Sequence, residues 1–122
     1  MRTILAAGAL AFACTSHAAA APDHYALRSA ADLARVCGTP SSASDYATAI
    51  AFCHGFLAGS YAYFQATTLP ASRFVCTPDP APTRAKVAND FVAWTKAHPQ
   101  YNGDGAVDAL FRFAAEAYPC KR

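Results

Sequence analysis

The sequence has few charged residues, and the two signs are nearly balanced. Only 15% of its 122 residues are charged, with 10 basic and 8 acidic side chains and a formal net charge of +2. No run of Lys or Arg could follow a phosphate backbone, which argues against a nucleic-acid partner. Disordered proteins are poor in apolar residues, whereas this chain is 54% hydrophobic and should fold. Its length allows one domain.

The sequence also lacks the residue combinations that catalysis and metal binding require. Glu116 is the sole Glu, no two carboxylates are placed for acid–base work, and no Gly-x-Ser-x-Gly turn occurs. No close Cys pair suggests a zinc site. Residues 102–108 match part of a calcium-binding loop, but Gln100 and Phe111 stand at its two end positions. We interpret this segment as a turn in which Asp104 caps the next helix, and predict a non-enzyme without metal or cofactor.

The first 20 residues have the features of a cleaved secretory signal peptide. Arg2 provides the positive start, and residues 4–13 form an uncharged apolar segment that small residues follow. This segment is shorter than the about 20 residues that span a membrane. Cleavage would leave one domain over residues 21–122, which we expect in the periplasm without a membrane anchor.

Cleavage also changes the cysteine count from odd to even. The sequence has 5 cysteines, of which Cys14 falls in the removed segment. In a lipoprotein signal Cys14 would be lipidated instead, but Ala11 stands where such signals usually carry Leu. The remaining cysteines are Cys37, Cys53, Cys76 and Cys120. Because small exported domains commonly carry disulfides, we predict two disulfide bonds among them.

Apolar residues at helical spacing predict an all-α fold, a compact bundle of about four helices with two disulfides. Ser29 and Asp32 form a capping pair for a short first helix, and Gly38 would end it. The other helices are expected over residues 44–66, 83–97 and 105–117. The last of them should point Val107, Leu110, Phe111, Ala114 and Tyr118 inward. No alternating pattern of useful length predicts a strand.

The expected helices favour one disulfide pairing. A short connection makes the third and fourth helices antiparallel neighbours, which places Cys76 beside Cys120. Cys37 would then pair with Cys53, provided that the loop after Gly38 folds back along the second helix. A crossed pairing stays open.

The second helix carries small residues along one side, including Gly55 and Gly59. Gly in a helix costs about 1 kcal/mol relative to Ala, so this spacing suggests that another backbone packs closely there. We therefore predict a central helix that is buried on most sides, in part at a subunit interface, with a homodimer as one option. A loosely packed central helix is the plainer alternative.

Four motifs occur together along the chain. They are Cys-His-Gly-Phe-Leu-Ala-Gly at 53–59, Phe-Val-Cys-Thr-Pro at 74–78, the segment from Phe91 through His98-Pro99, and 109–120 with its final Pro-Cys. Over roughly residues 30–120 this combination resembles the Rap/Tai family of periplasmic immunity proteins of type VI secretion. The resemblance implies a small exported helical protein that binds a cell-wall amidase effector and occludes its active site.

The resemblance also assigns structural roles to single residues. The four mature cysteines match the family's bridge positions, and Gly55 and Gly59 match its close-packing glycines. The proline-rich segment 78–82 departs from the family's shorter connection at this point. Effector-contacting residues lie in variable loops, so no motif transfers them.

Two classes of function fit these features. The first is an inhibitor that uses the loops 67–82 and 100–104, with Tyr101 as an exposed aromatic anchor beside Asn102 and Asp104. Substituting Tyr101 should then weaken binding without changing thermal stability. The alternative is an Hde-like acid-stress chaperone or a stand-alone stress protein of the same fold. The small number of acidic groups counts against an acid-triggered chaperone.

Overall fold

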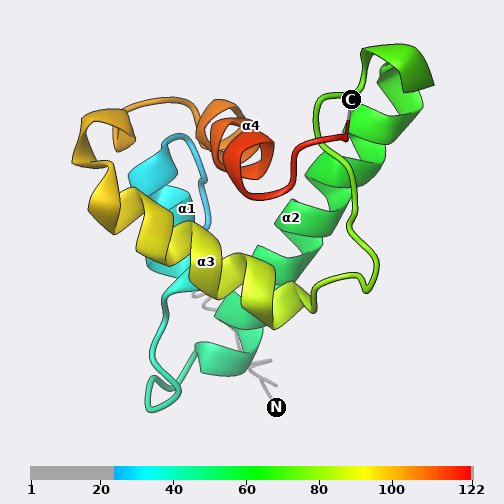
Figure 1. Ribbon diagram of the computed structural model, residues 1–122. Coiled ribbons are helices and arrows are strands. Elements are labelled where there is room, and N and C mark those ends of the chain that lie inside the picture. The colour runs from blue at the N-terminus through cyan, green and yellow to red at the C-terminus, as the bar shows by residue number, and fades with distance from the viewer. Residues whose placement is uncertain (1–23, 122) are drawn as a thin grey trace, which may run out of the picture.

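The computed structural model in Figure 1 describes residues 24–121 of the chain. The helices are α1 (Ala30–Cys37), α2 (Tyr46–Thr67), α3 (Arg84–Ala97) and α4 (Ala106–Ala117), with short 3-10 turns η1 (Pro70–Ser72) and η2 (Pro99–Tyr101). Within the described residues there is no strand, only two isolated bridges. The prediction of an all-α fold with four helices is therefore confirmed. The expected signal peptide, residues 1–20, lies outside the described residues.

Short-range capping signals fix the starts of two helices. Ser29 Oγ accepts a hydrogen bond from the Asp32 backbone N–H at 3.2 Å, and Asp32 Oδ2 accepts one from the Ser29 N–H at 3.0 Å. This capping box starts α1, and its hydrogen bonds from the Ser29 hydroxyl and backbone lower the pKa of Asp32. Thr83 caps α3 in the same way, accepting from the Lys86 N–H.

The centre of the bundle is α1, which packs against each of the other three helices. Its Leu33 and Val36 are fully buried, and α3 crosses in front of it in Figure 1. The prediction that the second helix is the central, mostly buried one is wrong. The buried residues of α2 are Ala49, Cys53, Leu57 and Phe64. The apolar residues of α2 are not confined to one side, but only the side that meets other helices becomes buried.

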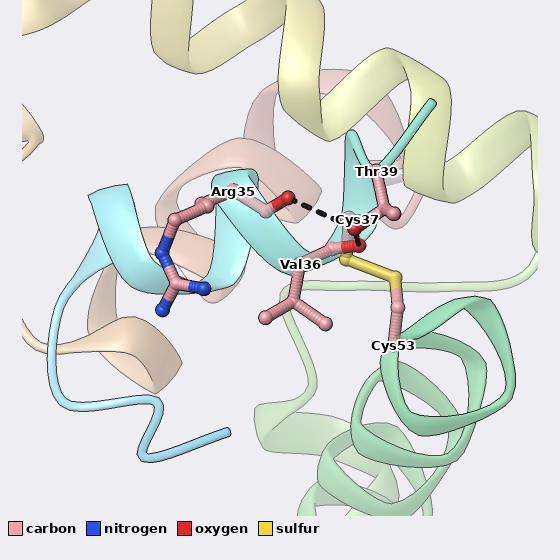
Figure 2. The surroundings of a disulfide bond; sticks show 5 residues. All are labelled: Arg35, Val36, Cys37, Thr39 and Cys53. Carbon is pink, nitrogen blue, oxygen red and sulfur yellow. Dashed lines mark hydrogen bonds between the residues drawn. A yellow bond between two sulfur atoms is a disulfide. The ribbon is translucent and has the colours of Figure 1, made fainter. Parts of the chain in front are cut away.

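Both disulfides join the partners that the sequence favoured. Cys37 at the end of α1 bonds to Cys53 of α2, and Cys76 bonds to Cys120. Figure 2 shows the first bridge beside the turn that follows α1, where the Thr39 hydroxyl donates to the carbonyl oxygens of Val36 and Arg35. These bonds fold the chain back toward α2, as the predicted pairing required.

The inward face of α4 differs from the prediction. Leu110 and Ala114 are buried as expected, but Val107 is 46% exposed. Phe113 is buried instead, where its ring packs against that of Phe91 at a centroid distance of 5.7 Å. Ala106 and Ala109 complete the buried side, so the core uses small residues whose hydrophobic signal is weak.

Candidate protein-binding surfaces

Tyr101, the predicted aromatic anchor, is packed rather than free. Its ring stacks on the Trp94 ring at a centroid distance of 5.5 Å, with an angle of 6° between the planes. The Arg112 guanidinium lies over the same ring, 4.3 Å from its centroid. Tyr101 is half-buried against the core, so the expectation of an exposed side chain is wrong. Its role in binding stays a prediction.

Asn102 and Asp104, the other two binding candidates, hold the start of α1 through their backbone. Their carbonyl oxygens accept hydrogen bonds from the N–H groups of Ala31 and Ala30, at 3.1 and 2.9 Å. The Asp104 carboxylate lies 3.6 Å from Arg112 at the surface. Asp104 does not cap α4, because the N-cap is Gly105 and no side-chain bond is made there. The loop 100–104 therefore stabilises the start of α1, whether or not it also contacts a partner.

Gly55 and Gly59 lie on the exposed side of α2. A Cβ added at either position would meet no atom within 4 Å among the described residues. The prediction of a closely packed backbone at these glycines is therefore wrong within the described chain. Their neighbours on the same side are also small and exposed, at Ala51, Ala62 and Ala66. None of the 22 residues of α2 is Asp, Glu, Lys or Arg, so this side offers a surface of small residues without acidic side chains, Lys or Arg.

The end of α2 forms a second exposed apolar surface. In Figure 1 its last turns and η1 extend beyond the other helices, at the upper right. We call residues 62–72 the α2 tip. It contains no charged residue, and Tyr63 and Leu69 are 72% and 75% exposed. Exposed apolar side chains on a projecting segment make it a candidate binding surface.

The α2 tip is held in place by Arg73 and by aromatic packing. The Arg73 guanidinium donates to the carbonyl oxygens of Gln65 and Thr68, at 2.7 and 3.3 Å. A cation at the carboxyl end of a helix is favoured because the last carbonyl groups lack partners. Phe64, a buried residue of the tip, packs on Phe74 with ring centroids 5.1 Å apart. The tip is therefore an ordered surface.

Comparison with protein families gives one match that spans most of the chain. The model of the Rap1a immunity proteins matches residues 29–120. The chain belongs to the Rap1a immunity protein family. No curated protein and no solved structure matches it. The resemblance seen in the sequence motifs is thereby confirmed, and with it a protein of the immunity class that acts on a protein partner.

The Rap1a match coincides with the folded unit. It begins at Ser29, the cap of α1, and ends at Cys120, the last bridge cysteine, so it includes all four helices and both disulfides. Some polar side chains inside this unit have structural partners. Glu116, the sole Glu, accepts a hydrogen bond from Trp94 Nε1 at 2.8 Å. Within the described residues no helix has the length and apolar character to span a bilayer.

Proposed function

We propose that this Rap1a-family protein acts in the periplasm, where it binds a cell-wall amidase effector of type VI secretion and occludes its active-site cleft. The family match supports an immunity role, and two disulfides are compatible with an oxidising compartment. The main structural support for occlusion is the α2 tip. It projects from the bundle, is uncharged and presents Tyr63 and Leu69 to solvent, so it suits insertion into a concave site.

Inhibition of an amidase by the purified mature protein tests this proposal. We expect peptidoglycan hydrolysis by an effector encoded beside the immunity gene to stop at equimolar protein. Leu69→Glu and Tyr63→Glu should each weaken binding by about 10-fold or more, since they place a charge in the contact. Ala93→Glu, which adds the same charge on the exposed side of α3, is the matched control and should bind normally. An effector that remains fully active would contradict the proposal.

We also propose that the exposed side of α2 around Gly55 and Gly59, before the α2 tip begins at residue 62, is covered by a second copy of the chain. Support comes from the absence of Asp, Glu, Lys and Arg from α2 and from small residues that allow two helices to approach closely. Gly55→Arg should separate the copies while leaving each one folded, because the side chain would extend into open space. Sedimentation of wild type and variant measures this. A wild-type protein that is monomeric at high micromolar concentration would disprove the dimer.

A further inference from the structure

An apolar cavity of about 230 Å³ opens between α2 and α4. Leu57 and Tyr61 of α2 line one side, and Leu110 and Phe113 of α4 line the other. Residues 75–78 and the start of α3 complete its walls. A cavity of about 150 Å³ suffices to take up benzene in a protein core. This one therefore has room for an aromatic or branched aliphatic side chain.

One wall of this cavity is cross-linked to the end of the chain. Cys76 lies in the lining and is bonded to Cys120, which fixes segment 75–78 to the end of the chain. The Cys76 N–H also donates to the carbonyl oxygen of Tyr118 at 2.9 Å. Pro78 and Pro82 stiffen the next stretch of the lining. Because these links restrain the wall, less ordering free energy is lost when a group enters the cavity.

The lining of the cavity includes one cation. Arg84, the first residue of α3, belongs to the lining. Among the described residues, no carboxylate forms an ion pair with its guanidinium. Asp90, near Tyr118, is already paired with Lys86 at 2.7 Å. An anion beside Arg84 would therefore interact with a positive charge that has no carboxylate partner among the described residues. It would also lie next to the amino end of α3, which favours negative charge.

A second polar group on the rim is the Tyr61 hydroxyl. It accepts a hydrogen bond from the Thr77 hydroxyl at 3.0 Å, which joins α2 to segment 75–78. In this arrangement the Tyr61 hydroxyl still has its own hydrogen to donate to another group. The cavity thus combines apolar walls with a cation and a hydroxyl group. This combination suits a ligand whose apolar group has a hydrogen-bond acceptor beside it.

We infer that this cavity receives an apolar side chain of the effector, either aromatic or branched aliphatic, whose neighbouring carboxylate pairs with Arg84. The inference rests on the proposed function and specifies the chemistry of the partner. Ala58 at the cavity lies eight residues before Ala66 in the α2 tip, a rise of about 12 Å along the helix. A protein–protein interface of standard area can include both the cavity and the α2 tip. The cavity would anchor the effector while the tip occludes its active site.

Filling the cavity tests this inference. Ala58 lines the cavity and is exposed, so Ala58→Phe places a ring in or across the opening without disturbing the core. We expect about 30-fold weaker binding of the amidase effector, the loss typical of an interface hot spot. Arg84→Glu should weaken binding by about 10-fold, and more strongly at low salt. Ala93→Phe, on the exposed side of α3, is the matched control and should bind as wild type.

Each outcome has a defined meaning. Helical circular dichroism and thermal unfolding should show that all variants fold, since none of these positions is buried. If wild type and Ala58→Phe bind the effector equally, the cavity inference is wrong while the immunity function stands. If Ala93→Phe weakens binding as much as Ala58→Phe, the cavity has no specific role. If octanoate binds wild type at micromolar concentration without displacing the effector, the cavity is a small-molecule site and the inference is overturned. If wild type does not bind the effector, the proposed function itself fails.

Discussion

Replacing both exposed glycines of α2 by alanine should stabilise the protein. The double variant Gly55→Ala, Gly59→Ala adds two methyl groups that meet no described atom within 4 Å. Gly costs about 1 kcal/mol relative to Ala inside a helix, so the pair should add about 2 kcal/mol to the free energy of unfolding. For a domain of about 100 residues this raises the melting temperature by roughly 8–16 °C.

Thermal unfolding followed by circular dichroism measures this effect, at a concentration where sedimentation shows a monomer. Gly38→Ala is the contrasting variant, because a Cβ there would lie 2.9 Å from the carbonyl oxygen of Ala34. It should lower the melting temperature. A double variant in the monomer that gains no stability would refute the reasoning, since it would mean that another part of the chain packs on this side of α2.

Four further predictions follow from single contacts. Tyr101→Ala should lower the free energy of unfolding in urea by about 1–2 kcal/mol, because the ring loses its stacking partners; unchanged stability would restore the exposed-anchor interpretation. Burial, and then Asp90, raise the pKa of Tyr118, so stability should fall as the pH rises above about 10, and Tyr118→Phe should make this fall shallower. Replacing Cys76 and Cys120 by Ser opens a loop with a sequence separation of 44 and should cost about 4 kcal/mol in chemical denaturation. The pKa of Asp32 is lowered by Ser29, so its contribution to stability is present above about pH 4 and is lost as the pH falls through the lower folded value; Asp32→Asn should remove this dependence. Helical circular dichroism should nevertheless persist at pH 2, whereas an acid-activated chaperone would lose its fold.

Features that depend on neighbouring residues were predictable from the sequence. Ser29 and Asp32 lie three residues apart, so their reciprocal hydrogen bonds need only one turn of helix. Thr83 caps α3 for the same reason. The disulfide pairing followed from a short connection between two helices, which leaves few arrangements of the remaining cysteines.

Features that depend on distant parts of the chain could not be predicted from the sequence. The small and apolar residues of α2 suggested burial, yet the neighbours needed to cover Gly55 and Gly59 are absent from the described chain. Val107 and Phe113 are both apolar, and the position of α4 over α3 decides which of them enters the core. Tyr101 is covered because Trp94 and Arg112, from two different helices, converge on its ring. Sequence spacing carries no signal for such convergence.

Positions of the candidate site were predictable only in part. The loops on either side of α3 were expected to bind a partner, but the largest exposed apolar side chains at the end of α2 are Tyr63 and Leu69. The spacing of Tyr63 did not show which way it points, because the apolar residues of α2 are not confined to one side. The cavity beside Arg84 also had no sequence signal, since its walls come from three helices and a loop.

The most direct test of the proposed function is an inhibition titration. The mature protein is added to a purified amidase effector encoded beside it, and the release of peptidoglycan fragments is measured. We predict that hydrolysis falls linearly to zero at a one-to-one molar ratio, and that Leu69→Glu replaces this linear fall by a gradual curve that needs excess protein for full inhibition. Full hydrolysis in the presence of excess wild-type protein would contradict the proposal that this chain occludes the active site of such an effector.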